Sequence, residues 1–432
     1  MMRRDSSPAS PVRVGLIGAG KFGSMFLAQV PTTPAIEIAA IADLDPARAR
    51  RACEAVGWDA PRIAGTAFLE DGAAMAREID LDVVIEATGS PLAGIRHARA
   101  AIAARRHVVM VNVEADALVG PLLAAEARAA GVVISMAYGD QPALVAELVE
   151  WARDCGFPVV AAGKGTKYLP GYHELTPDRV WDHYGITAEG ARAAGMNSQM
   201  FTSFMDGTKS AIEMAAIANS CGLDAPAMGL AFPPCGVDDL PHVLRPREDG
   251  GILDAKGMVE VVACDERDGR PVFRDLRWGV YVVVEAPNPY SAACFAQYGV
   301  KTDRTGRYAA LYRPCHLIGL ELGRSVLRAA RDGRPIGSVT EFRADVMAVA
   351  KRDLKPGDRL DGEGGYAAYG RVAPAARAMA EGALPIGLAH DAVVRHPIAR
   401  GEVIRWDAVE IDTTRADVVA RREMEARFAP VG

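Results

Sequence analysis

The sequence predicts an α/β protein: a doubly wound parallel sheet, then a central α+β domain and a small C-terminal β domain. Short apolar runs that end in glycine or acidic residues alternate with helix-like stretches along the N-terminal third of the chain, as in βαβ units. The alternation weakens after Cys155, and residues 346–412 contain a weak repeat of short strands with glycine-acid turns. We expect a disordered N-terminus at residues 1–11 and domains at 12–152, 153–340 and 341–432.

The composition is that of a globular protein with several domains. The 432 residues are 50% apolar and 24% charged, close to the average of soluble chains. The formal charge of −6 argues against nucleic acid and acidic membranes as partners. Seven cysteines without a Cys-x-x-Cys pair indicate reduced thiols, and no uncharged run reaches the roughly 20 residues of a membrane helix. We therefore expect a cytoplasmic protein that acts on a small molecule.

The first apolar run leads into a glycine-rich turn. Val12 to Ile17 is typical of a buried parallel strand, and it stops at Gly18. In such a turn the first glycine permits the tight bend, Gly20 lets a pyrophosphate approach the backbone, and Gly23 lets the next helix pack closely. We expect this Rossmann-type turn to bind NAD or NADP. Its residues are Gly18, Ala19, Gly20, Lys21, Phe22 and Gly23.

The second expected strand, Ile36 to Ala42, ends in Asp43, about 20 residues beyond the last glycine. An acid at this place accepts hydrogen bonds from the adenosine ribose, and together with Asp45 it repels a 2′-phosphate, so NAD is favoured over NADP. The alternative for Asp43 is a helix N-cap ahead of Pro46. Basic residues after it offer a route to NADP, but a solvated helix face is the simpler explanation of them; these are Arg48, Arg50 and Arg51.

Polar residues follow three further expected strands. These strands are Val83 to Ala87, His107 to Val113, and Val132 to Ala137. The carboxyl edge of a doubly wound sheet lines the cofactor crevice, and we place the residues after the strands beside the dinucleotide. They are Thr88, Gly89, Glu114 and Asp140.

A lysine between two glycines follows the expected strand Pro158 to Ala162. Lys164 is predicted to lie in an open turn, where its ammonium could hold an anionic group or stabilise developing negative charge. The alternative is an ordinary exposed lysine.

The stretch Phe201 to Gly222 is predicted to form one helix. Asp206, Lys209 and Glu213 are spaced by three and then four residues, so they share a face. The remaining residues are mostly apolar, which indicates a buried helix, and buried charges are costly unless they pair or bind a ligand. We favour a pocket-facing row over a structural ladder of ion pairs.

A further cluster surrounds a proline before an apolar stretch that carries Glu321. Arg313 could clamp a carboxylate or phosphate, and His316 could move a proton near neutral pH. Each is also a common structural residue.

Most of the chain resembles the proteins similar to, but distinct from, the usual 1-deoxy-D-xylulose 5-phosphate reductoisomerase. They have a cofactor domain like that of homoserine dehydrogenase and a C-terminal SAF domain with a β-clip fold, and they include an NAD-dependent oxidoisomerase of apionate. The segments that carry the resemblance are Val14-Gly-Leu-Ile-Gly-Ala-Gly, Ala87-Thr-Gly, Val111-Asn-Val-Glu-Ala-Asp, Ala162-Gly-Lys-Gly, Asp206-Gly-Thr-Lys, Glu213-Met-Ala-Ala-Ile-Ala-Asn and Arg313-Pro-Cys-His-Leu.

The resemblance implies a reductoisomerase or oxidoisomerase that couples rearrangement of a hydroxy-carbonyl compound to hydride transfer. It implies a divalent ion such as Mg or Mn on Asp206, Glu213 and Glu321. It also implies that charge stabilisation or proton transfer falls to Lys164, Lys209 and His316.

One departure from the resemblance moves the expected substrate toward a sugar acid. Asp43-Leu44-Asp45 stands where NADPH-using members carry basic residues. The competing hypotheses are a homoserine-type dehydrogenase without rearrangement and a non-catalytic sensor that binds a dinucleotide or sugar acid. We expect a homodimer.

Overall fold

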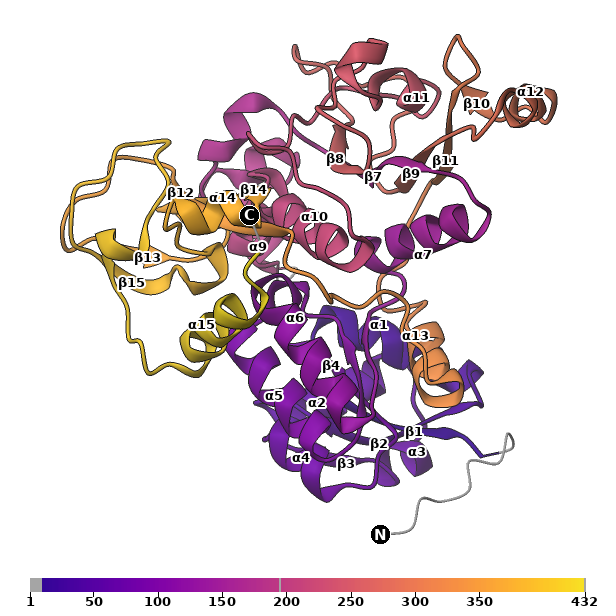
Figure 1. Cartoon of the computed structure of the whole chain (residues 1–432). Helices are drawn as coiled ribbons and strands as arrows, with labels where there is room; N and C mark the ends of the chain where they lie inside the picture. The colour runs from indigo at the N-terminus through magenta and orange to yellow at the C-terminus, as the bar shows by residue number, and fades with distance from the viewer. Residues whose placement is uncertain (1–9, 194–195, 431–432) are drawn as a thin grey trace. The chain divides into compact units, whose positions relative to one another are not determined.

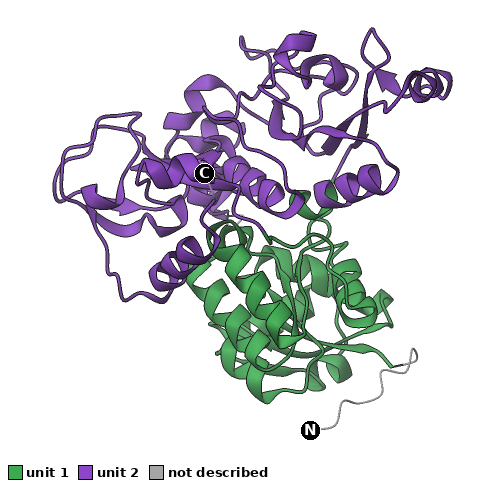
Figure 2. Ribbon diagram, viewed as in Figure 1, with its two compact units in different colours: residues 1–144, 316–340 green, residues 145–315, 341–432 purple. Residues whose placement is uncertain are grey.

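The computed structural model describes residues 10–193 and 196–430. These residues, whose helices and strands are labelled in Figure 1, form two compact units, which Figure 2 shows in different colours. Unit 1 combines the described residues up to Leu144 with His316–Thr340, and unit 2 combines Val145–Cys315 with the described residues from Glu341 onward. Most of the segment expected to be a disordered N-terminus, residues 1–9, lies outside the described residues.

Unit 1 contains the predicted doubly wound sheet. Its six parallel strands have the order β3-β2-β1-β4-β5-β6, so the winding reverses between β1 and β4. The apolar runs of β1 and β2 form strands because they are buried on both faces of the sheet. The strands are β1 (Val12–Ile17), β2 (Ile36–Ala42), β3 (Ala67–Leu69), β4 (Val83–Glu86), β5 (His107–Met110) and β6 (Ile134–Met136).

Helices connect these strands, and a late segment of the chain completes the packing. Leu322 and Val326 pack into the same buried cluster as Val83 and Val109, so residues 316–340 belong to unit 1 rather than to the central domain where the sequence placed them. The helices are α1 (Lys21–Gln29), α2 (Pro46–Ala55), α3 (Ala60–Ala64), α4 (Gly72–Glu78), α5 (Pro91–Ala103), α6 (Val113–Ala130) and α13 (Gly323–Leu327), which a π-helical turn, Arg328–Asp332, extends.

Unit 2 contains a mixed five-stranded sheet of order β10-β11-β9-β7-β8, in which β7 and β8 are parallel and β9 is antiparallel to β7. The strands are β7 (Val159–Thr166), β8 (Met258–Ala263), β9 (Val280–Glu285), β10 (Lys301–Thr302) and β11 (Tyr308–Arg313). The helices are α8 (Ala188–Ala193), α9 (Ser198–Met205), α10 (Thr208–Cys221), α11 (Leu240–Val243) and α12 (Pro289–Gln297), while the division between the units falls within α7 (Gln141–Asp154).

Residues 341–430, called the C-terminal part below, form the small antiparallel β domain that the sequence predicts. Two sheets build it, β12-β14 and β13-β15-β16. The elements are β12 (Ala344–Ala350), β13 (Arg359–Asp361), β14 (Ala368–Pro374), α14 (Ala375–Ala380), β15 (His390–Val394), β16 (Val409–Glu410) and α15 (Ala416–Phe428).

The single helix predicted for Phe201 to Gly222 is wrong. Gly207 has a φ of +88°, in the left-handed region, which ends α9 and starts α10 as a separate helix. Gly222 does terminate α10, with a φ of +61°. The break leaves Asp206 between two helices rather than in the middle of one.

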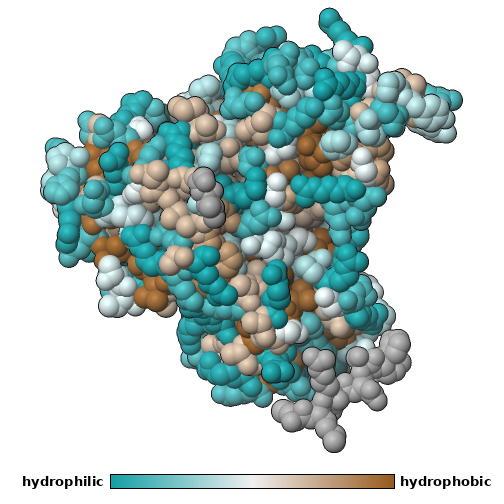
Figure 3. All heavy atoms as spheres, in the orientation of Figure 1, coloured by the Kyte–Doolittle hydropathy of each residue, from teal (hydrophilic) through white to brown (hydrophobic). Residues whose placement is uncertain are grey.

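The molecular face in Figure 3 is mostly hydrophilic, and its hydrophobic residues appear in small separate patches. None of the helices in the described part of the chain combines the length and the apolar character that crossing a bilayer requires.

Candidate functional site

The glycine turn joins β1 to α1 and leaves its backbone open to a ligand. A Cβ built on Gly23 would lie 2.4 Å from the carbonyl oxygen of Gly18, so the close packing requires glycine. No heavy atom lies within 4 Å of a Cβ built on Gly20. Lys21 and Phe22 begin α1, whose N-terminus favours an anion.

Asp43 lies directly after β2 and contacts the glycine turn. Its carboxylate accepts hydrogen bonds from the N–H groups of Ala19, at 2.9 Å, and Asp45, at 3.0 Å. The guanidinium of Arg48 reaches both of its oxygens. Burial opposes ionisation of Asp43, but these hydrogen bonds outweigh burial and lower its pKa. The helix N-cap is Asp45, which accepts the N–H of Arg48.

The remaining predicted cofactor residues follow β4, β5 and β6 at the carboxyl edge of the sheet. Thr88 and Gly89 are exposed just after β4, and the Thr88 hydroxyl donates to Glu86 at 2.6 Å. Glu114 lies in the first turn of α6, and Asp140 directly precedes α7. Ligands bind at this edge of doubly wound sheets. The open glycine backbone, the helix N-terminus and the ionised Asp43 together fit NAD(P).

Two acids that the sequence did not single out, Glu86 and Asp116, are buried at the same edge. Glu86 is fully buried, with Oε1 3.1 Å from Nδ1 of His97. Asp116 is also buried, and its pKa is raised well above the ordinary value by burial and by the negative charges of Glu114 and Glu86. An acid that ends an otherwise apolar strand was the one sequence signal for Glu86.

Lys164 lies inside β7, not in an open turn after it. Its side chain is buried and forms an ion pair with Glu213 of α10. The flanking glycines serve close packing: a Cβ on Gly163 would lie 1.8 Å from the carbonyl oxygen of Glu260, and one on Gly165 would meet another backbone carbonyl at 2.0 Å. The sequence could not distinguish this use of glycine from a turn.

Asp206 is fully buried at the junction of α9 and α10. Its Oδ1 accepts the N–H of Thr208 at 2.8 Å. The ammonium nitrogen of Lys351 lies 2.8 Å from Oδ2, which receives no directed hydrogen bond from the described residues. Charge attraction therefore joins this pair.

A histidine contacts the backbone of Asp206. Nδ1 of His173 lies 2.6 Å from the Asp206 carbonyl oxygen, so Nδ1 carries the proton. Nε2 then accepts the hydroxyl of Tyr168 at 2.8 Å. Burial lowers the pKa of His173 and raises that of Tyr168 to about 12, which keeps both groups neutral near pH 7.

Lys209 differs in burial from its neighbours on α10. Every residue from Thr208 to Asn219 is buried except Lys209, which is half-buried. We use the name lysine site for five residues, namely two ion pairs at α10 together with Lys209. They are Lys164, Lys209, Lys351, Asp206 and Glu213.

Lys351 was not predicted as a member of this site. It directly follows the apolar strand β12 and precedes the exposed Arg352 and Asp353, so in sequence it looks like an ordinary surface lysine. Its partner Asp206 lies far away in the chain, and no local pattern reports such a contact.

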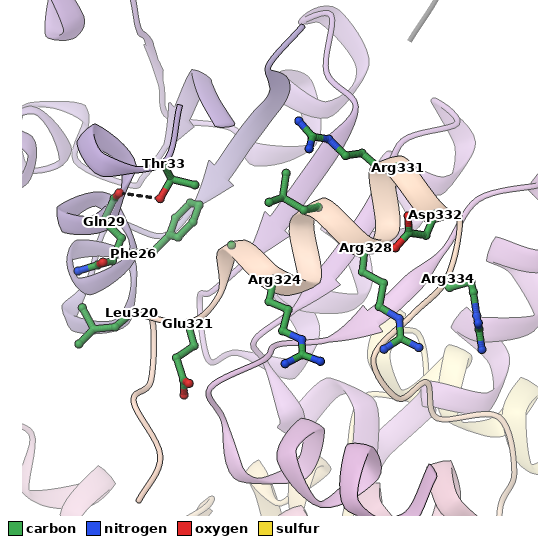
Figure 4. A pocket seen from close by; sticks show the side chains of 12 residues that line it. Phe26, Gln29, Thr33, Leu320, Glu321, Arg324, Arg328, Arg331, Asp332 and Arg334 are labelled. Carbon is green, nitrogen blue, oxygen red and sulfur yellow. Dashed lines mark hydrogen bonds between the residues drawn. The ribbon is translucent and has the colours of Figure 1, made fainter. Parts of the chain in front are cut away.

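The predicted residues around Pro314 fall in both units. Arg313 ends β11 in unit 2 and donates to the carbonyl of Cys315 at 3.1 Å. His316 and Glu321 belong to unit 1. Figure 4 shows Glu321 in the lining of a cavity of about 740 Å³ between α1 and residues 320–334. The other charged residues of this lining are Arg324, Arg328, Arg331, Asp332 and Arg334.

The residues do not fit the metal centre that the resemblance implies. Asp206 and Glu213 are each matched with a lysine, and Glu321 lies in the other unit. Across residues 10–193 and 196–430, no three side chains of histidine, cysteine, aspartate or glutamate come together as a ligand set.

Three family models match the chain. "Oxidoreductase family, NAD-binding Rossmann fold", the Gfo/Idh/MocA model, matches residues 12–111. "Oxidoreductase DRL, catalytic domain" matches residues 139–322, the range that holds Lys164, Asp206, Lys209 and Glu213. The SAF domain model matches residues 345–410, which confirms that part of the resemblance.

Several solved structures are similar in part. WlbA dehydrogenase from Bordetella pertussis, in complex with NADH and UDP-GlcNAcA, is 22% identical over 37% of this chain and 48% of its own, with a TM-score of 0.27. A probable dehydrogenase from Thermotoga maritima is 14% identical over 75% of this chain and 90% of its own, with a TM-score of 0.37. This chain thus spans about half the length of WlbA dehydrogenase. No curated protein matches the sequence.

The parallel sheet and its cofactor edge fit the NAD-binding Rossmann model, and the matched catalytic-domain model is also that of an oxidoreductase. The domain set of the chain combines a Gfo/Idh/MocA-type cofactor domain with a DRL catalytic domain and a SAF domain.

Proposed function

We propose that the protein couples hydride transfer between NAD and a sugar acid or sugar phosphate to a rearrangement of the substrate's hydroxy-carbonyl skeleton. The lysine site, in which Lys209 is the half-buried member, is the observation that carries this proposal. Such a site attracts an anionic substrate. A neutral polyol gains nothing from it.

Lys209 binds the anionic group of the substrate. Its half-buried ammonium is attracted to a carboxylate or phosphate more strongly than a fully solvated lysine would be, because the neighbouring residues of α10 exclude water. This contact fixes one end of the substrate and leaves its hydroxyl and carbonyl groups free to react.

The pair of Lys164 and Glu213 handles the reacting oxygens. The ammonium of Lys164 stabilises negative charge on a substrate oxygen, and the carboxylate of Glu213 takes the hydroxyl proton. NAD, when bound, accepts the hydride that leaves the same carbon. A rearrangement requires that adjacent oxygens stay together, and the ammonium of Lys164 has N–H donors that can hydrogen-bond them.

The choice of NAD over NADP rests on Asp43. Its ionised carboxylate lies at the glycine turn and repels a 2′-phosphate. Arg48 opposes this preference, because its guanidinium could receive that phosphate instead.

The rearrangement has separate support. The segments Asp206-Gly-Thr-Lys209 and Glu213-Met-Ala resemble the reductoisomerase-like family, whereas the matched models specify only an oxidoreductase. Simple dehydrogenation is therefore the alternative that the experiment must separate.

A panel of sugar acids and sugar phosphates tests the proposal. Nicotinamide absorbance identifies a substrate, and NMR of the ¹³C-labelled product reports its skeleton. We expect a rearranged product, and a strong loss of rate in Lys209→Ala but not in Lys355→Ala, a control lysine that is exposed. An oxidised product with an unchanged skeleton would overturn the rearrangement. If no compound changed the absorbance while NAD still bound, the sensor hypothesis would gain.

A further inference from the structure

Helix α10 lies between two sheets of unit 2. One side packs on β7 and β8, where Glu213 meets Lys164, and the other side packs on β12 and β14 of the C-terminal part, as Figure 1 shows. The helix that carries Lys209 is therefore held from two directions. The C-terminal part packs against α10 on one of these two sides.

The C-terminal part contacts both ends of α10. At the start, Lys351 pairs with Asp206, and the Thr208 hydroxyl accepts the N–H of Gly370 at 2.8 Å. At the end, the side chain of Asn219 donates to the carbonyl of Ala344 at 2.9 Å and accepts the N–H of the same residue at 2.8 Å. These contacts fix the helix along its axis as well as across it.

Among the residues of the C-terminal part that contact α10, Lys351 is the one whose presence packing alone does not explain. Its side chain is 2% exposed, and its ammonium donates to the carbonyls of Leu175 and Gly365, both at 2.7 Å. Replacing a buried ion pair with apolar residues of similar size is often neutral or stabilising. Stability alone is therefore a weak explanation for the buried pair of Lys351 and Asp206. The pair does, however, fix the orientation of the Asp206 carboxylate, which apolar residues could not do.

We propose that the SAF domain is a working part of the lysine site, in which Lys351 is a positioning residue for Lys209. Lys351 fixes Asp206, Asp206 fixes the N–H of Thr208, and this first turn of α10 sets the direction of Lys209. The inference rests on the proposed function for the role of Lys209 toward substrate. The positioning itself is testable without any substrate.

Competitive chemical labelling of the lysines in the full chain tests whether Lys351 positions Lys209. Trace acetic anhydride is added to the native protein, and mass spectrometry compares the labelling of Lys209 with that of the exposed Lys355. The variants are Lys351→Met, the conservative Lys351→Arg, and Thr208→Val, which replaces the hydroxyl that accepts the Gly370 N–H with a methyl group. Asp417→Asn is the matched control, because Asp417 is buried in the C-terminal part but pairs with Arg415 at 2.6 Å.

We expect the Lys209 to Lys355 ratio to change at least threefold in Lys351→Met and in Thr208→Val, and to return toward the wild-type value in Lys351→Arg. Asp417→Asn should lower the melting temperature without changing the ratio. An unchanged ratio in a folded Lys351→Met or, if that variant does not fold, in Thr208→Val would overturn the proposal, as would an equal change in Asp417→Asn. A failed substrate panel would overturn the proposed function and leave this result standing.

Discussion

The guanidinium of Arg48 contacts both carboxylate oxygens of Asp43, at 2.7 and 2.8 Å. The Asp43 side chain is 1% exposed, whereas that of Arg48 is 56% exposed. The acid is therefore held in place at the glycine turn, while the arginine can leave toward solvent. This asymmetry leads to two predictions about the cofactor.

Asp43→Ala should weaken NAD binding at least tenfold and weaken NADP binding less, because NAD loses a partner for its ribose while NADP loses a repulsion. Calorimetric titration of both cofactors measures this. Asp59→Ala is the control, since Asp59 is another acid of unit 1 with a structural role, the N-cap of α3, but is not at the glycine turn. Tighter binding of NADP than NAD by the wild type would count against the proposed preference.

Arg48→Gln should weaken NADP binding and leave NAD binding equal or tighter. A hydrogen bond to a charged group contributes about 1.5–3 kcal/mol, so we expect at least about a tenfold loss for NADP. The same titration measures it. Equal losses for the two cofactors would indicate that Arg48 supports the fold of the site rather than selecting the phosphate.

Variants of the ion pair between Lys164 and Glu213 should affect stability and activity differently. Lys164→Met leaves a buried carboxylate without its partner, a change that costs about 3–5 kcal/mol. The double variant Lys164→Met with Glu213→Leu should recover most of this stability in urea unfolding and should have no oxidoreductase activity. An active double variant would show that the pair is only a structural ladder.

Glu260 should make stability fall as pH rises. It is buried on β8, and burial raises its pKa to about 7 although it accepts three backbone N–H groups. The folded state therefore keeps a proton that the unfolded chain releases near its ordinary pKa, so the free energy of unfolding falls between about pH 4.5 and pH 7.

The matched variant is Glu260→Gln, which imitates the protonated acid. Urea unfolding from pH 5 to pH 8 should show a smaller decrease for this variant, by on the order of 1–3 kcal/mol. Parallel curves for the two proteins would contradict the assignment, because other groups that titrate in this range affect both equally.

The sequence predicted the cofactor domain well because its signals are local. An apolar run that stops at Gly18 and another that stops at Asp43 define β1 and β2 with the correct ends. The lysine site was harder to predict from the sequence. Its pair of Lys164 and Glu213 joins a strand to a helix, and that of Asp206 and Lys351 joins the centre of the chain to its C-terminal part. Such contacts depend on tertiary packing, which a local pattern does not report.

Two errors have the same physical origin. Glycine permits turns, close packing and left-handed backbone alike. The sequence therefore indicated a turn around Lys164, where Gly163 and Gly165 allow close packing instead, and an unbroken helix through Gly207, where the left-handed backbone ends α9.

The central claim is that the lysine site selects an anionic substrate through Lys209. Its most direct test compares kcat/KM for NAD reduction by the sugar acid that the panel identifies and by the corresponding neutral polyol, in the wild type and in Lys209→Ala. We predict that the wild type prefers the acid at least about tenfold, the value of one charge-assisted hydrogen bond, and that Lys209→Ala loses this preference. Equal use of acid and polyol by the wild type, or an undiminished preference in Lys209→Ala, would contradict the account.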